Sequence, residues 1–233
     1  MRILLVGHGR MGRLVEALAP EYGCEVAGTL DSRSAHGADG LESPRWADVE
    51  VAIDFSAPSA VAATVSALAA RRINLVVGTT GWQKDEAAVR RAVDRGGIGI
   101  VAAPNFSTGV VLLEAIVADA AALFRGRPEF GAWIHEAHHA AKKDAPSGTA
   151  LLMKRAMEAA GYDKPIDVSS TRAGHIPGSH TIGFDGPAES IAIAHVARDR
   201  STFARGALEA ARWVRGKRGW FTMRDVLGIE EES

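Results

Sequence analysis

Two histidines, a lysine and a helix-start signal lie within the segment 136–150. His138 can accept or donate a proton near neutral pH. Ser147 is a favoured N-cap residue, and the free backbone N–H groups of a helix start bind carboxylates well. The charged groups nearby can add charge-assisted hydrogen bonds to an anion. We therefore predict proton transfer beside a carboxylate pocket, which His139, Lys142, Ser147, Gly148 and Thr149 would form.

Two residue types in this part of the chain have simpler explanations. Each histidine by itself would more often be a solvated surface imidazole, and only the clustering ahead of a helix start favours a functional site. Arg172 could clamp a second carboxylate with its planar guanidinium, or it could be a solvated arginine at a strand end. The sequence leaves both alternatives open for Arg172.

The residues 135–139, His-Glu-Ala-His-His, also match the H-E-x-x-H zinc pattern. Zinc binding would need both histidines on one helix face and a third ligand, for which His175, His180 and His195 are available. The stretch 131–134 before the motif predicts a strand instead of a helix. We therefore expect no metal at this segment.

A glycine-rich turn, Gly7-His8-Gly9-Arg10-Met11-Gly12, follows a short apolar run. Apolar residues at helical spacing come next, and Asp31 ends the following predicted strand, nineteen residues past Gly12. In this fingerprint the glycines allow a tight turn, close approach of a pyrophosphate, and packing of helix on strand. We predict that these six residues and Asp31 bind a dinucleotide, in preference to a turn that merely requires glycine.

The preference between the two nicotinamide cofactors stays open, leaning towards NADH. Asp31 suits a hydrogen bond to the ribose 2′-hydroxyl of NADH. Arg33 could instead receive the 2′-phosphate of NADPH, or it could be a solvated loop residue.

Two later turns follow predicted parallel strands and therefore lie on the same rim of the sheet. Ligands of open α/β sheets bind at this rim, although ordinary turn chemistry would also explain the small and hydroxyl residues there. The residues that we expect to touch the cofactor are Gly78, Thr79, Thr80, Ala103, Pro104, Asn105 and Phe106.

Strands alternate with helices over residues 1–104, as in βαβ units with a parallel sheet. The expected strands are 3–6, 25–30, 51–55, 74–78 and 98–102, and the expected helices are 11–18, 58–71 and 83–94, with a loop at 39–46. Strands outnumber helices further on, which indicates a separate α+β unit. The elements expected there are helices 107–124 and 147–160, strands 132–136, 166–172, 179–184 and 189–195, and a last helix at 201–215.

Composition excludes several classes of partner. The 233-residue chain has a net charge of -1 and a pI near 6.7, so no basic field attracts nucleic acid or anionic lipid. Its single cysteine, Cys24, cannot form an internal disulfide, which fits a reducing cytoplasm. No apolar run reaches the length of a membrane span. We expect a cytoplasmic protein that acts on a small molecule.

The segment from Glu136-Ala137-His138-His139 through Lys142 to Asp144-Ala145-Pro146-Ser147-Gly148-Thr149-Ala150 resembles the signature of a known enzyme family. The family is that of the 4-hydroxy-tetrahydrodipicolinate (dihydrodipicolinate) reductases of bacterial lysine biosynthesis. Further similar motifs occur at 9–12, 54–56, 78–81, 104–107 and 172–174, and the resemblance extends to 223–227.

The resemblance implies an α/β fold: a Rossmann-type parallel-sheet domain and a smaller α+β domain built on a mixed sheet. The first domain would span 1–104 plus about 203–233, and the second, 105–202, would bind substrate and form a homotetramer. NADH or NADPH would reduce a cyclic dicarboxylic imine in the lysine and diaminopimelate pathway. Ser32 stands where NADPH-favouring members often have arginine, which again favours NADH.

The resemblance also implies roles for individual residues of the histidine–lysine segment. His138 falls at the acid/base position of the family and Lys142 at its proton-donor position. His139, Gly148 and Thr149 fall at positions that bind substrate.

Three rival functions differ from this one in class or substrate. An NAD-dependent dehydrogenase of similar build could act on another substrate, and a catalytically silent chain could sense dinucleotides. A dinucleotide sensor without catalytic activity would not require His138, Lys142 or the anion-binding helix start. A zinc hydrolase would require stoichiometric metal.

Overall fold

The chain folds into two compact units, and each is described here by itself. The computed structural model describes residues 1–31, 40–41 and 43–229. The first unit comprises Met1–Thr108 with Ser201–Ser233, and the second is Gly109–Arg200. Ser32 and Arg33, on which the expected cofactor preference partly depends, lie outside the described residues, and so does the acidic stretch 230–232.

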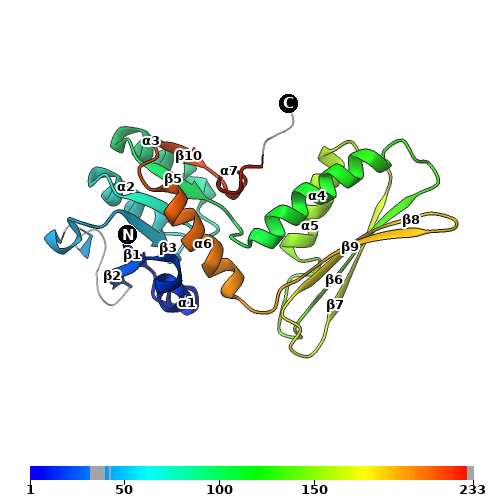
Figure 1. The fold of residues 1–233 in the computed structure, drawn as a ribbon, viewed down its shortest axis with the longest axis horizontal. Helices are drawn as coiled ribbons and strands as arrows, with labels where there is room; N and C mark the ends of the chain where they lie inside the picture. Colours follow the sequence, from blue (N-terminus) through cyan, green and yellow to red (C-terminus); the bar gives the residue numbers. More distant parts are fainter. Residues whose placement is uncertain (32–39, 42, 230–233) are drawn as a thin grey trace. The chain divides into compact units, whose positions relative to one another are not determined.

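The first unit is built on a six-stranded parallel sheet with the strand order β10-β5-β4-β3-β1-β2 (Figure 1). After β1 the chain moves to one side to form β2 and then returns to the other side of β1 to form β3. The order therefore reverses between β1 and β3, and ligands of open α/β sheets bind at such a switch point. The strands are β1 (Arg2–Val6), β2 (Glu25–Leu30), β3 (Val51–Asp54), β4 (Asn74–Val77), β5 (Gly99–Ala102) and β10 (Gly219–Phe221).

Helices cover both faces of this sheet, which is why its strands consist almost entirely of apolar residues. Two of them, α2 (Val61–Ala70) and α3 (Glu86–Gly96), pack together over one face, and α1 (Arg10–Leu18) and α6 (Ser201–Val214) pack together over the other. Residues 3–5 of β1, for example, are at most 1% exposed. The Rossmann-type architecture predicted for this part of the chain is confirmed.

Some elements of the first unit differ from those expected. The helix expected at 58–71 begins only at Val61, whereas α1 ends at Leu18 as expected, before a 3₁₀ turn (Ala19–Tyr22) that contains Pro20. Two more 3₁₀ turns lie at Pro44–Trp46 and Gln83–Asp85. Strand β10 and helix α7 (Met223–Leu227) were not expected, because elements of three and five residues are too short to show periodicity. A sequence signal for α7 does exist, since Thr222 and Asp225 form a capping box at its start.

The second unit is a four-stranded mixed sheet with the order β7-β6-β8-β9, in which only β6 and β7 run parallel. Two helices, α4 (Thr108–Phe124) and α5 (Gly148–Ala159), bury their apolar residues against one face of this sheet (Figure 1). This confirms the α+β class predicted for this part of the chain. The strands are β6 (Gly131–His138), β7 (Ile166–Arg172), β8 (Ser179–Asp185) and β9 (Ser190–Val196).

Alternation along β6 places its residues on two different faces. Ile134 packs in the core beneath the helices, and Glu136 and His138 follow on the same side. Trp133 and His135 lie on the opposite face, where α4 and α5 do not pack. The strand therefore directs one carboxylate and one imidazole towards the start of α5. Separately, within the described part of the chain, no helix is long and apolar enough to cross a membrane.

Candidate active site

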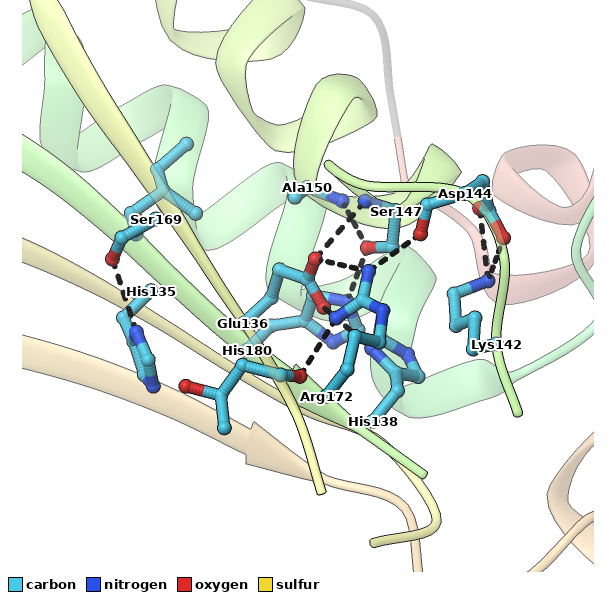
Figure 2. Close-up of polar contacts among 12 residues, drawn as sticks. His135, Glu136, His138, Lys142, Asp144, Ser147, Ala150, Ser169, Arg172 and His180 are labelled. Carbon is cyan, nitrogen blue, oxygen red and sulfur yellow. Dashed lines mark hydrogen bonds and ion pairs between the residues drawn. The ribbon is translucent and has the colours of Figure 1, made fainter. Parts of the chain in front are cut away.

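A buried carboxylate lies at the centre of the polar cluster in the second unit. Glu136 is 0% exposed, and Figure 2 shows its two oxygens facing the guanidinium of Arg172. Nη2 of Arg172 donates to Oε1 at 2.7 Å, and Nη1 donates to Oε2 at 2.9 Å. The pair is bidentate, the strongest geometry for an arginine and a carboxylate. Removing Arg172 would leave the buried carboxylate of Glu136 without a compensating charge.

The Glu136 carboxylate also holds the imidazole of His138. Nδ1 of His138 lies 2.5 Å from Oε2 of Glu136, and the His138 side chain is 12% exposed. Burial raises the pKa of Glu136, but hydrogen bonds from Arg172, Ser170 and His138 outweigh it and bring the pKa down to about 2. The glutamate is therefore ionised at neutral pH.

The pKa of His138 is lowered, so its imidazole is neutral at physiological pH. Burial is the main cause, assisted by the positive charges of Lys142 and Arg172, and it outweighs the opposite effect of Glu136. Because Glu136 is ionised and can only accept, Nδ1 of His138 carries the hydrogen. The other ring nitrogen, Nε2, is then an acceptor. A Cβ on Gly178 would lie 3.1 Å from that nitrogen, so the glycine keeps the space beside it open.

The start of α5 is fastened to the same carboxylate. The backbone N–H of Ser147 donates to Oε1 of Glu136 at 3.2 Å, and the Ser147 hydroxyl accepts the N–H of Ala150 at 3.2 Å. Ser147 is thus the N-cap that the sequence predicted. Gly148 follows on the surface, and a Cβ added there would meet nothing within 4 Å. The space beside Gly148 is therefore open, while its backbone N–H donates to the carboxylate of Asp144.

Lys142 and His139 lie in the turn after β6. Nζ of Lys142 lies 2.8 and 2.9 Å from the two carboxylate oxygens of Asp144. This ion pair lowers the pKa of Asp144. The N–H of Lys142 donates to the carbonyl of His139 at 3.0 Å, which closes the turn. Figure 2 places Lys142 and Asp144 near Ser147, at the edge of the buried cluster.

The structure gives Arg172 a partner within the protein that the sequence did not suggest. The sequence raised the possibility that Arg172 clamps a carboxylate of the substrate, but its terminal nitrogens hold Glu136 and, at 2.6 Å, the carbonyl of Asp144. The sequence did not place Glu136 among the site residues, although E-x-H in a strand is a usable signal because residues i and i+2 share a face.

The helix that the H-E-x-x-H pattern requires is not formed. His135 lies on β6, on the face opposite Glu136, and its Nδ1 is 3.0 Å from the hydroxyl of Ser169. Ligand atoms of Glu136, His138 and His180 do lie within 4.8 Å of one another. However, both oxygens of Glu136 already bind the Arg172 cation, which is the charge that a metal would otherwise supply.

The first three residues of the glycine-rich turn, Gly7, His8 and Gly9, line a cavity of about 630 Å³ in the first unit, at the switch point between β1 and β3. A Cβ on Gly12 would lie 2.1 Å from the carbonyl oxygen of Gly7, whereas one on Gly9 would meet nothing within 4 Å. Gly12 is therefore required for packing of α1, while Gly9 leaves open space before the helix start. Asp31 lies on the same cavity. These residues fit the pyrophosphate and ribose of a dinucleotide.

The same cavity has walls that were not assigned from the sequence. Residues from the end of β3 and the start of α2, including Phe55, Ser56 and Ala60, line it opposite the glycine turn. These residues directly follow a parallel strand, and the carboxyl ends of such strands bind ligands. The same rule predicted the cofactor contacts of the two later turns. His8, within the turn, lies 2.7 Å from the Glu16 carboxylate through its Nε2.

The residues of the two later turns serve the fold in several ways. The Thr79 hydroxyl donates to Oδ1 of the buried Asp54 at 2.7 Å and accepts the N–H of Ser56 at 2.8 Å. Gly78 is needed because a Cβ would lie 2.1 Å from the ring of Phe55. Phe106 is 2% exposed and packs edge-on against Phe55. Of the other expected residues, Thr80 and Pro104 are exposed, Ala103 is half-buried, and Asn105 accepts the N–H of Ser107 at 2.8 Å.

A Rossmann-type unit with a dinucleotide turn, together with a separate unit that carries an acid–base cluster, is the construction of hydride-transferring enzymes. The class that the fold and the site define is therefore that of the nicotinamide-dependent oxidoreductases.

Family models specify the class further. The model described as "Dihydrodipicolinate reductase, N-terminus" matches residues 1–106, and the model described as "Dihydrodipicolinate reductase, C-terminus" matches residues 109–227. The chain belongs to the dihydrodipicolinate reductase family, as its motifs predicted.

Curated relatives called 4-hydroxy-tetrahydrodipicolinate reductase are similar over their whole length. The protein of Rhodopseudomonas palustris (strain BisA53) is 36% identical, with 100% of this chain and 98% of the relative covered. That of Parvibaculum lavamentivorans is 38% identical, with 99% and 98% covered.

Solved structures agree on the fold. A dipicolinate-bound dihydrodipicolinate reductase from Paenisporosarcina sp. TG-14 superposes with a TM-score of 0.80 at 21% identity, covering 99% of both chains. A probable dehydrogenase from Thermotoga maritima gives a TM-score of 0.61 at 10% identity, covering 97% of this chain and 92% of that chain. At these identities the likeness concerns the fold alone.

Proposed function

We propose that this chain reduces 4-hydroxy-tetrahydrodipicolinate to tetrahydrodipicolinate in lysine and diaminopimelate biosynthesis. The observation that carries the proposal is the joint attachment of His138 and the α5 start to Glu136. A proton-transfer group and an anion pocket are thereby held together, as a dicarboxylic substrate requires.

Proton transfer falls to His138 and Lys142. The neutral His138 offers Nε2 as a proton acceptor, and its Nδ1–H stays bound to Glu136. The Lys142 ammonium carries a proton that it can donate, and Asp144 holds it in place by an ion pair. We assign the donation to the reduced substrate to Lys142 and the acid/base role to His138.

Substrate binding falls to the start of α5 and the turn before it. The backbone N–H groups at the start of α5 and the positive end of the helix dipole suit a carboxylate, and the N–H of Gly148 already donates to the carboxylate of Asp144. His139 and the Thr149 hydroxyl can add hydrogen bonds. Arg172 acts indirectly, because it holds Glu136.

The first unit would bind the dinucleotide and the second unit the substrate. When bound, a nicotinamide supplies the hydride for the reduction. We propose NADH as the preferred form, since Asp31 lines the cavity. Its carboxylate would accept a hydrogen bond from a ribose 2′-hydroxyl and would repel a 2′-phosphate. The contacts with this cofactor would come from residues 7–12 and 78–80 and from residues 103–106.

We further propose a homotetramer in the cytoplasm. The sheet face that carries Trp133 is not the one that α4 and α5 cover, and Val196 at its edge is 65% exposed. A sheet with one such face gains from pairing with another copy. The buried, unpaired Cys24 fits a reducing compartment.

The test is a coupled assay in which a dihydrodipicolinate synthase generates the substrate and oxidation of NADH or NADPH is followed at 340 nm. We expect oxidation that depends on the synthase product, with the larger kcat/KM for NADH. No oxidation of either cofactor with an active synthase would overturn the proposal. Equal rates with both cofactors would overturn only the preference.

A further inference from the structure

Glu136 emerges from the structure as a residue with a role of its own. We propose that Glu136, held by Arg172, is a positioning residue that fixes the tautomer of His138 and couples its orientation to the carboxylate pocket. The proposal rests on the proposed function for its kinetic consequences. Its structural part stands without that function.

The tautomer follows from which groups can donate. An ionised carboxylate only accepts, and Arg172 and the Ser147 N–H only donate. The contact of 2.5 Å between Oε2 and Nδ1 of His138 must therefore also have its hydrogen on the nitrogen. Nε2 of His138 is left as the acceptor. With the opposite tautomer, two acceptors would face each other in a buried site.

Arg172 makes this arrangement possible by supplying the balancing charge. Glu136 is completely buried, and a buried carboxylate without a partner takes up a proton. A protonated Glu136 could donate to Nδ1 and would then reverse the tautomer. The other charged or titratable groups that act on His138 are Lys142, from the turn, and His180, whose ring centroid on β8 lies 5.1 Å away.

One carboxylate thus fixes two functional groups. Oε2 orients the imidazole, and Oε1 accepts the Ser147 N–H directly before the anion-binding N–H groups of α5. A change at Glu136 should therefore affect turnover and substrate binding together. A change that affected only the imidazole would alter turnover alone.

The first experiment observes the tautomer without substrate or cofactor. Long-range ¹⁵N–¹H correlation spectra, assigned with His138→Asn, distinguish Nδ1–H from Nε2–H imidazoles. We expect the Nδ1–H form in the unmodified protein and in Glu136→Asp, which keeps a carboxylate. In Glu136→Gln, whose amide can donate to Nδ1, we expect the Nε2–H form. An Nε2–H imidazole in the unmodified protein would overturn the proposal even if the variants failed to fold.

The second experiment measures kinetics in the same variants. For Glu136→Gln we expect kcat to fall by roughly 10²–10⁴-fold, as when a catalytic imidazole is held in the wrong tautomer, and KM for the substrate to rise. The acid limb of the kcat/KM profile should move to lower pH, because Glu136 raises the pKa of His138. Glu136→Asp should recover part of kcat. The exposed Glu158→Gln is the matched control and should change nothing.

The outcomes separate this proposal from the proposed function. A Glu136→Gln variant that keeps the Nδ1–H imidazole, or keeps kcat within threefold, would overturn the positioning role. An unmodified protein that shows the Nδ1–H tautomer and its dependence on Glu136, yet lacks reductase activity, would support the positioning role and overturn the proposed function.

Discussion

Nε2 of His180 lies 3.0 Å from the hydroxyl oxygen of Ser147, and both side chains are buried. The two residues are 33 positions apart in the chain, and they join β8 to the start of α5. The pKa of His180 is lowered to about 4, mainly by burial and to a smaller extent by the neighbouring His138. The folded protein therefore holds His180 neutral where an exposed histidine would begin to be charged.

Stability should consequently depend on pH. In the unfolded chain His180 becomes protonated near pH 6.5, whereas in the folded chain it becomes protonated only near pH 4. The stabilisation is thus fully present above pH 6.5 and is lost as the pH falls to 4, by an amount on the order of 3 kcal/mol. Urea unfolding at several pH values measures it. His180→Gln should flatten this slope, and the exposed His175→Gln should retain it.

A second loss of stability should follow at lower pH. The pKa of Glu136 falls from 4.5 to about 2 on folding, so its stabilisation is present above pH 4.5 and is lost between 4.5 and 2. An unfolding free energy that falls only between pH 6.5 and 4, with no further loss below pH 4, would contradict this assignment. Unfolding curves of Glu136→Gln, if it folds, should lack the lower component.

Two glycines of the same turn should respond differently to alanine. Gly12→Ala forces a Cβ to 2.1 Å from the Gly7 carbonyl, so we expect a loss of about 1–3 kcal/mol in unfolding free energy. Gly9→Ala meets no protein atom, so its melting temperature should stay within about 2 °C while the Kd for NADH rises at least tenfold. Thermal melts and fluorescence titration measure the two effects. Unchanged NADH affinity in Gly9→Ala would contradict the assigned pyrophosphate site.

Lys142 and its neighbour Lys143 form a matched pair for testing proton donation. Lys142→Met should lower kcat by roughly 10²–10⁴-fold, because it removes a proton donor, and should leave the Kd for NADH unchanged. Lys143 is exposed, and Lys143→Met should keep kcat within twofold. Loss of NADH binding together with kcat would indicate misfolding instead.

Replacing Asp144, the ion-pair partner of Lys142, should affect stability and catalysis less than replacing Lys142 itself. Asp144 is exposed, and such pairs contribute about 0–1 kcal/mol to stability. Asp144→Asn also removes a carboxylate that competes with the substrate for the ammonium group. We expect an unchanged melting temperature and a KM for the substrate that is equal or lower. A large rise in KM would show that Asp144 itself takes part in binding.

The proposed tetramer can be tested on the sheet face that α4 and α5 leave open. Ala194 of β9 lies on that face and is exposed, so Ala194→Arg would place a charge in an interface formed there. We expect dissociation in analytical ultracentrifugation with little change in circular dichroism. Ala88→Arg, on the exposed side of α3, is the control. A tetramer that persists in Ala194→Arg would place the interface elsewhere.

The features that could be predicted from the sequence are those that depend on residues close together in the chain. The turn from Gly7 to Gly12, the Ser147 cap and the strand–helix alternation depend on backbone conformation over a few residues. The G-x-G-x-x-G turn and the histidine–lysine segment could therefore be recognised from the sequence alone. Short elements such as β10 could not be predicted, because three residues are too few to show a hydrophobic periodicity.

The partners of the charged groups depended on the tertiary structure. Arg172 binds Glu136 because β6 and β7 pair in a register that sets Ser170 beside Glu136, two residues before the arginine. Ser147 meets His180 because β8 pairs with β6. Local pattern says which side of a strand a residue takes, but the choice of neighbouring strand and its register is made by packing of the whole sheet. For this reason the sequence indicated proton chemistry at His138, whereas only the fold assigned Glu136 to orient it.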